Sequence, residues 1–441
     1  MNKAIDAFGK DTFEFFIYLR NQYIGQENQN NEKFNSYIVE HSLDWGNVDF
    51  HLQNRIIKWE DLNIILNSDK FSYIENFKDY QLSVLPLNLF LGENVLNKYI
   101  PRKDYGISDN IDPYGIFTKE SKILSNRTDE LVLASQKFKH TVLMNLYDQC
   151  VIGCSGCYKG YYTREKKHKF GLNSLSTAVK QAKELTEYLN NHPEIYDVII
   201  SGGEPLLLDN ATLDKVLYEL SLAKYLQVIR LCTGSLFMGL PVRFDDELIN
   251  ILKKYKQHKR ITINAHLSNP EQIDYESKEA VTKLNNIGIN IYSQVPVQND
   301  INFFIDDLEK TLKYFVELGK KQVFNSIEPY MLIVDMHPRM KSQYIPLEIL
   351  LKFWGALVES HNYPGLERPR TLSILFQEGN VIVSSHMLYS MSKIVDGENE
   401  VVTYKIPLIN LNGEIEKFYI YNEPLSKYNN DENSLDKYFR S

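Results

Sequence analysis

From about residue 140 onward, short β-rich runs alternate with amphipathic helical stretches, and this alternation limits the fold more than any other feature. Strands that alternate with helices pair in parallel through right-handed crossovers, and buried parallel strands are mostly β-branched or apolar. We predict six such strands: Thr141–Tyr147, Asp197–Ser201, Val228–Cys232, Ile261–Ala265, Ile289–Val297 and Val323–Val334. Between them, Ala211–Lys224 is typical of the helices, with Asp209 or Asn210 as its N-cap. The sequence predicts an α/β protein. Periodicity alone is compatible with both an open doubly wound sheet and a barrel.

The 441 residues change character twice along the chain. Residues 1–135 hold helical segments and a stretch over 85–116 that is punctuated by Pro, Gly, Asn and Asp, so we predict a helical N-terminal extension. Residues 136–340 carry the strand–helix alternation and form the predicted core. Residues 341–441 are predicted to form a helix and a β-rich cap, because β-rich runs over 371–421 are separated by Gly and Asn turns.

Composition restricts the partners and the compartment. The formal net charge is −8, which argues against a nucleic-acid partner because phosphates attract basic surfaces. No apolar run is long enough to span a membrane and the first residues lack a signal peptide's apolar run, so we expect a cytoplasmic protein without membrane contact. Three of the four cysteines fall within eight residues, which suits a metal or cluster site better than a disulfide framework.

The clustered cysteines, Cys150, Cys154 and Cys157, follow directly after a predicted strand. Their thiolates therefore gather on a loop at the carboxyl end of a parallel strand, where barrel enzymes place their chemistry. A cubane of four irons with three cysteine ligands keeps one iron open for a reactive molecule. A structural zinc site would need a fourth ligand, and Cys232 lies on another predicted strand; three packed thiols are the remaining alternative. We interpret the triplet as the ligand set of a [4Fe-4S] cluster.

The second predicted strand ends in Ser201-Gly202-Gly203-Glu204-Pro205. Glycines let the backbone approach a ligand closely, and Glu204 offers an acceptor to an ammonium group, although such a segment by itself is an ordinary turn. Together with the CxxxCxxC loop one strand earlier, it resembles the radical S-adenosylmethionine (SAM) superfamily. The resemblance implies a partial (β/α)6 barrel in which Gly202, Gly203 and Glu204 hold the methionine amino group of SAM. It also implies that SAM, chelated by the open iron, is cleaved to a 5′-deoxyadenosyl radical. Gly156 departs from the family pattern, since an aromatic residue usually precedes the third cysteine.

Further segments resemble the lysine 2,3-aminomutase family within that superfamily, in the same order along the chain. They are Leu52–Ile56 with Trp45, Asp148-Gln149, Leu240–Arg243, Asn264–Pro270 and Ser293–Val295. The likeness thus runs over about residues 45–420.

The resemblance implies roles for four polar residues. His266 and Gln294 would contact SAM, Lys159 would stand in for an arginine that pairs with the substrate carboxylate, and Asp335 would hold the substrate's distal amine. Each has a plainer explanation. His266 and Gln294 could be hydrogen-bonded structural residues at strand ends, Lys159 a solvated loop lysine, and Asp335 a capping or surface aspartate.

The resemblance fails at the site for pyridoxal phosphate (PLP). The family attaches PLP to a lysine that follows a glycine run, but the corresponding segment Leu375–Ser385 contains no lysine. The phosphate-binding arginines fall near Lys137 and Thr141, so part of the phosphate clamp is missing as well. We therefore expect PLP to be absent. A displaced lysine such as Lys393 is the alternative.

The sequence predicts a radical SAM enzyme that abstracts hydrogen from an amino-acid-like small molecule, with rearrangement, dehydrogenation, epimerisation and elimination all open. The chemistry implies a low-potential electron donor such as flavodoxin or ferredoxin, and a homo-oligomer is compatible with the sequence. Three alternatives remain: a PLP-dependent amino-acid 2,3-aminomutase, a catalytically silent iron–sulfur or SAM-binding paralogue, and a zinc-binding interaction module.

Overall fold

In the computed structural model the chain divides into two compact units. The first comprises Met1–Val295, Val323–Ser326 and Asp335–Ser342, and the second comprises Pro296–Gln322, Ile327–Val334 and Gln343–Ser441. The structure describes residues 17, 39, 44–56, 58–66, 85, 134–147, 149–150, 152, 175–237, 240–267, 269–298, 302–304, 307–320, 326–332, 345–359, 372–376, 379–382, 392–397, 401–409 and 415–424. The predicted division at residues 135/136 and 340/341 stays a prediction.

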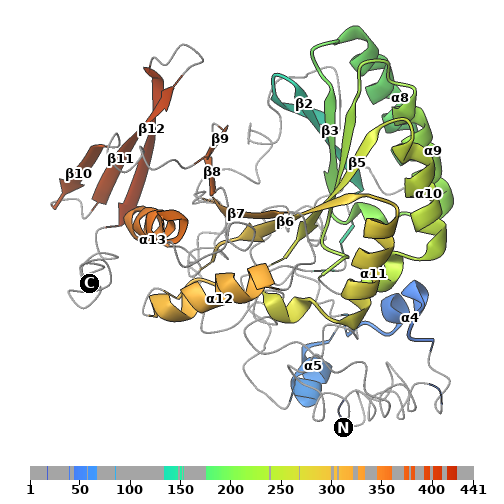
Figure 1. Cartoon of the computed structure of the whole chain (residues 1–441), viewed down its shortest axis with the longest axis horizontal. Helices are drawn as coiled ribbons and strands as arrows, with labels where there is room; N and C mark the ends of the chain where they lie inside the picture. Colours follow the sequence, from blue (N-terminus) through green and yellow to red (C-terminus); the bar gives the residue numbers. More distant parts are fainter. Residues whose placement is uncertain are drawn as a thin grey trace. The chain divides into compact units, whose positions relative to one another are not determined.

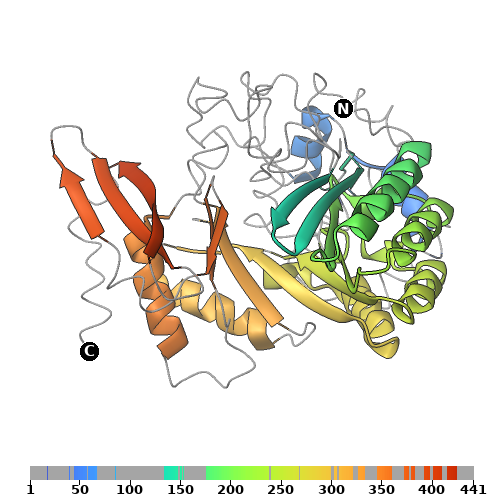
Figure 2. The same ribbon diagram turned by 90° about the horizontal axis from the view of Figure 1, so that it is seen from above.

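Six strands of the first unit form one sheet, which Figures 1 and 2 show from two directions. Strands β2 to β6 run parallel in sequence order, and β1 pairs antiparallel with β2. Their bounds are β1 Ala134–Phe138, β2 Thr141–Tyr147, β3 Asp197–Gly202, β4 Val228–Thr233, β5 Arg260–His266 and β6 Asn290–Pro296. Since the chain advances one strand at a time, the carboxyl ends of all five parallel strands lie along one edge of the sheet.

The structure confirms the predicted α/β class and the first five predicted strands as parallel neighbours, with ends that differ from the prediction by one residue or none. The sixth strand, predicted over Val323–Val334, is described over Ser326–Leu332. Strand β1 was missed because its sequence, Ala-Ser-Gln-Lys-Phe, is largely polar and its only described pairing is antiparallel with β2. The predicted irregular stretch over 85–116 lies outside the described residues except for Leu85.

Four helices connect the strands of the first unit: α8 Leu175–Asn191, α9 Asn210–Ser221, α10 Asp246–Lys256 and α11 Tyr275–Asn286. Helices α8, α9 and α10 lie side by side along one face of the sheet (Figures 1 and 2). Of the two predicted caps for α9, Asp209 is the N-cap, because its carboxylate accepts the backbone N–H of Thr212 at 2.8 Å. Leu213, Val216 and other apolar residues on one face of this helix are buried, as the helical spacing predicted.

Helices α4 (Val48–Gln53) and α5 (Trp59–Leu66) precede the sheet in the sequence. Just before α4, the Trp45 indole N–H donates to Glu276 of α11 at 3.2 Å, which ties this segment to the first unit. His51 lies fully buried, with Nε2 donating to the Trp45 carbonyl oxygen at 2.7 Å. Burial lowers the pKa of His51 to about 4, so its ring is neutral at physiological pH.

The second unit contains α12 (Leu308–Lys320), β7 (Ser326–Leu332) and α13 (Leu347–Glu359), with Phe303 and Phe353 in edge-to-face contact at 5.0 Å between ring centroids. Strand β8 (Ser373–Phe376) runs parallel to β7 and forms an antiparallel pair with β9 (Gly379–Ile382).

Near the end of the chain the structure describes a separate antiparallel sheet, within the segment 341–441 that was predicted to form a helix and a β-rich cap. Its role as a cap stays a prediction. The sheet contains β10 (Ser392–Asp396), β11 (Val401–Ile409) and β12 (Ile415–Pro424). Val402, Tyr404 and Ile406 are buried at alternate positions of β11, as expected for a sheet with one covered face. Within the residues described, no helix is long and apolar enough to cross a membrane.

The contact between Trp45 and Glu276 predicts how stability depends on pH. Burial, and next the negative charge of Asp274, raise the pKa of Glu276 to about 8 from an ordinary value of 4.5. Because the pKa is higher in the folded state than in the unfolded state, protonation of Glu276 stabilises the fold. This stabilisation is full below pH 4.5 and is lost as the pH rises through about 8. We expect Glu276→Gln, which stays neutral and still accepts from Trp45, to stabilise the protein by about 1 kcal/mol more at about pH 9 than at about pH 5.

Urea unfolding followed by tryptophan fluorescence measures this difference, with the exposed Glu271→Gln as the matched control. An equal effect of Glu276→Gln at both pH values would contradict the raised pKa.

Candidate functional site

The cysteine loop begins where β2 ends. Cys150 follows three residues after Tyr147 and is half-buried, and Ile152 is buried. Cys154, Cys157 and Lys159 lie outside the described residues, as does Asp335. The structure therefore places the first predicted cluster ligand at the carboxyl edge of the sheet, and the other two ligands stay predictions.

The glycine-rich turn after β3 lies against the chain that enters this loop. Gly203 N–H donates to the Tyr147 carbonyl oxygen at 2.6 Å, and Glu204 N–H donates to the Gln149 carbonyl oxygen at 2.8 Å. Gly202 has φ +142°, and a Cβ at this position would stand 2.2 Å from the Tyr147 carbonyl oxygen. Only glycine fits here, since both the backbone conformation and the close approach exclude a side chain.

Glu204 is almost completely buried, at 1% exposure, and its carboxylate is held by the protein itself. It accepts the Thr233 hydroxyl at 2.7 Å, the Gly234 N–H at 2.8 Å and the Leu206 N–H at 3.1 Å. Burial raises the pKa of the Glu204 carboxyl, while these hydrogen bonds act in the opposite direction. A carboxylate offers about four acceptor positions, so a ligand ammonium group would share this oxygen pair with three internal donors. Contact with SAM stays a prediction for Gly202, Gly203 and Glu204.

Arg243 fastens the segment that follows Glu204. Its buried guanidinium donates from Nε to the Leu206 carbonyl oxygen at 2.7 Å and from a terminal nitrogen to the Leu208 carbonyl oxygen at 2.9 Å. Asp245 lies 3.8 Å from the same guanidinium. Sequence reasoning found Arg243 only as part of a family-like segment, and it missed Thr233 and Gly234; the Thr-Gly pair at the end of a predicted strand was the available signal.

The remaining predicted SAM contacts lie at the same edge. His266 and Gln294 are register partners at the ends of β5 and β6, and both are half-buried. The Leu267 N–H donates to the Gln294 carbonyl oxygen at 3.0 Å, which holds the two strand ends together. Cys232 lies within β4 opposite Asn264. The structure thus aligns Cys150, the glycine-rich turn, His266 and Gln294 along one edge, where the parallel strands have their carboxyl ends.

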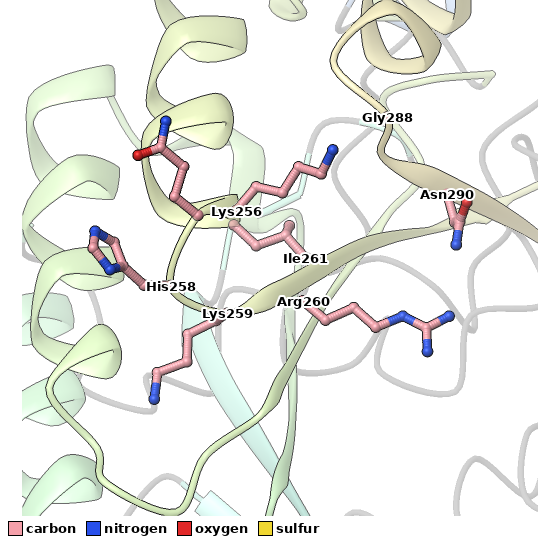
Figure 3. A pocket seen from close by; sticks show the side chains of 8 residues that line it. Lys256, His258, Lys259, Arg260, Ile261, Gly288 and Asn290 are labelled. Carbon is pink, nitrogen blue, oxygen red and sulfur yellow. The ribbon is translucent and has the colours of Figure 1, made fainter.

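A basic pocket of about 370 Å³ opens at the other edge of the sheet, where β5 and β6 begin (Figure 3). Its lining residues are Lys256, Gln257, His258, Lys259, Arg260, Ile261, Gly288 and Asn290. Lys259 Nζ donates to the carbonyl oxygens of Ala223 and Leu226 at 2.6 and 2.7 Å, just beyond α9, and Lys256 Nζ donates to the Ile287 carbonyl oxygen at 2.5 Å, beyond α11. The ammonium groups thus satisfy carbonyl groups at helix ends. Figure 3 shows Lys256 directed toward Gly288, while Lys259 and His258 point elsewhere.

The donor set fits an iron–sulfur cluster. Three thiols would complete three irons of a cubane, and the glycine-rich turn is hydrogen-bonded to Tyr147 and Gln149, just before Cys150. Among the described residues no group of three His, Cys, Asp or Glu side chains offers a competing metal site.

Comparison with known proteins agrees with this chemistry. Residues 141–268 match a family described as a 4Fe-4S single cluster domain. The chain is 30% identical over 217 residues to an L-lysine 2,3-aminomutase of Methanococcus maripaludis, covering 49% of this chain and 46% of the relative. It is 26% identical over 288 residues to a glutamate 2,3-aminomutase of Clostridioides difficile, covering 62% of this chain and 63% of the relative. An L-lysine 2,3-aminomutase of Clostridium subterminale is 24% identical over 300 residues, with 65% of each chain covered.

The aligned regions span from about half to two thirds of the length of these curated relatives. The matches confirm the resemblance drawn from the sequence, and with it a [4Fe-4S] cluster and SAM as the cofactors. By its cluster domain and its relatives, this chain is similar to the radical SAM aminomutases.

Proposed function

We propose that this protein is a radical SAM enzyme that abstracts hydrogen from an amino-acid-like small molecule without using PLP. The observation that carries the proposal is the position of Cys150 beside the Gly202–Glu204 turn, at the edge where five parallel strands end. Cys150, Cys154 and Cys157 would hold the cluster, and the strands would form the partial (β/α)6 barrel. The aminomutase relatives support an enzyme of this class.

The chain's own residues divide the work between holding SAM and holding the substrate. Gly202, Gly203 and Glu204 would hold the methionine end of SAM, with His266 and Gln294 as further polar contacts from β5 and β6. Lys159 and Asp335 would bind the carboxylate and the amine of the substrate. When bound, the cluster supplies one electron to SAM, whose cleavage gives methionine and the radical that takes a hydrogen atom from the substrate. A low-potential donor of the flavodoxin or ferredoxin class would return that electron to the cluster.

Three positions in the chain support the absence of PLP. The segment that corresponds to the family's lysine forms the β8–β9 pair, whose sequence contains no lysine. Thr141, near the place of a phosphate-binding arginine, donates its hydroxyl proton to Asp197 at 2.9 Å. Lys393, the alternative attachment point, lies on β10 with Nζ 2.5 Å from a carboxylate oxygen of Glu348. An ammonium group held by a carboxylate is a poor nucleophile for an aldehyde.

The cluster assignment predicts a pattern of iron contents. After anaerobic reconstitution the protein should carry about four irons per chain, and Ala at Cys150, Cys154 or Cys157 should remove most of them. Iron and sulfide analysis with a visible spectrum measures this, and a colourless zinc protein would support the interaction-module alternative. Cys232→Ala is the matched control and should keep full iron, since it lies on β4 rather than in the loop. Loss of the cluster in that variant would contradict an open fourth iron.

Radical chemistry predicts a product. Reduced, cluster-loaded protein should convert SAM to 5′-deoxyadenosine and methionine, whereas the triple Cys→Ala variant should not. Chromatography of the quenched reaction quantifies both products. A loaded and reduced protein that yields no more 5′-deoxyadenosine than this variant would identify a silent paralogue.

The PLP proposal predicts the absence of a specific adduct. Incubation with PLP followed by borohydride should label scattered surface lysines only, because the sequence lacks both the family's lysine and part of its phosphate clamp. Peptide mass spectrometry identifies the labelled positions, and Lys393→Ala serves as the control. Stoichiometric labelling of one lysine that disappears in Lys393→Ala would instead establish a PLP-dependent aminomutase.

A further inference from the structure

Gly234, in the turn after β4, lies against Ile152 of the cysteine loop. A Cβ built on Gly234 would stand 2.6 Å from Cδ1 and 3.6 Å from Cγ2 of Ile152, and 3.7 Å from an oxygen of Glu204. Ile152 is buried, and it lies midway in the sequence between Cys150 and Cys154. The missing side chain at Gly234 therefore leaves the space that the Ile152 side chain fills.

Gly234 is itself fixed by Glu204. Its N–H donates to one carboxylate oxygen at 2.8 Å, and the Thr233 hydroxyl donates to the other at 2.7 Å. The Thr233 oxygen accepts the Ser235 N–H at 2.9 Å, so the hydroxyl proton is directed to Glu204. Because Glu204, Thr233 and Ser235 are buried, their polar groups would be costly to leave unpaired, and the turn has little freedom to move.

Glu204 is fixed in turn to the start of the cysteine loop. Its N–H donates to the Gln149 carbonyl oxygen at 2.8 Å, and Arg243 holds the two carbonyl groups of Leu206 and Leu208 just beyond it. The two contacts with the loop therefore flank Cys150. Gln149, one residue before it, is held by Glu204, and Ile152, two residues after it, is held against Gly234.

We propose that Thr233 and Gly234 are positioning residues for the cluster: through Glu204 and Ile152 they hold the cysteine loop on both sides of Cys150. The proposal rests on the proposed role of Cys150 as a cluster ligand. A ligand needs its rotamer and backbone locked by surrounding groups to within about 0.5 Å, and side chains that orient metal ligands affect metal retention strongly. Neither residue is a catalytic residue, since both act through other residues.

Gly234→Ala tests the packing of Ile152 against Gly234. The atom that the new methyl group meets is the end of a flexible side chain, so Ile152 can shift while the fold persists. We expect the reconstituted variant to lose its cluster to a chelator about tenfold faster than wild type. Ile152→Val removes the Cδ1 atom, so the double variant Gly234→Ala/Ile152→Val should return to the rate of Ile152→Val alone. Gly397→Ala, where an added Cβ meets nothing within 4 Å, is the matched control.

Thr233→Val and Thr233→Ser test the hydrogen bond from Thr233 to Glu204. They decide whether the positioning role holds if Gly234→Ala fails to fold. Valine removes the donor to Glu204, whereas serine keeps it, so only valine should accelerate cluster loss and change the electron paramagnetic resonance spectrum of the reduced cluster. A purely structural role would change the urea midpoint of Thr233→Val and leave the cluster spectrum unchanged.

The proposed function and this inference fail in different ways. Wild-type protein that takes up no cluster, or Cys150→Ala that keeps it, would overturn the proposed function. With those two results as expected, equal cluster loss in wild type, Gly234→Ala and Thr233→Val would overturn the positioning role. If a folded Gly234→Ala loses its cluster faster and Ile152→Val does not rescue it, the packing of Ile152 against Gly234 is not the cause, and that part of the proposal is overturned.

Discussion

The buried Glu204 carboxylate organises the edge of the sheet that carries the candidate site. Removing a carboxylate from water is unfavourable unless donors replace the lost hydration, and here the donors come from the turn after β4 and from the residues after Glu204 itself. These three donors favour the ionised form, but burial is the larger effect and raises the pKa of the Glu204 carboxyl. The interaction therefore fixes the loops after β3 and β4 relative to each other, and Gln149 and Ile152 contact these two loops in turn.

Parallel pairing explains why distant segments meet at this edge. A residue at the end of one strand is brought beside the end of the next by register alone, as Thr233 is beside Ala265 and His266 beside Gln294. A register shift between Asn145 and Tyr147 brings Tyr147 opposite Gly202, so the chain leaves β2 directly over the glycine-rich turn. The loops can vary in length and chemistry while their starting points stay aligned.

Local patterns predicted much of this arrangement. The strands β2 to β6 and helix α9 follow from runs of apolar residues and their periodicity, and Asp209 was one of the two caps expected for α9. The partners of Glu204 were not predictable, because Thr233 and Gly234 lie 29 and 30 residues away and their contact depends on side-chain placement in three dimensions. The pairing of Glu276 with Trp45, 231 residues apart, was hidden for the same reason.

The matched cluster domain contains this network. The cluster-domain match covers residues 141–268, which include Glu204, Gly234 and Arg243, whereas the β8–β9 pair lies in the second unit, beyond that match. Generating a radical demands a fixed geometry around the cluster and SAM, and the substrate's chemistry is set by different side chains. Under the proposed function, the network around Glu204 therefore constrains how the radical is made, and the lack of a lysine in the β8–β9 strands bears on the substrate chemistry alone.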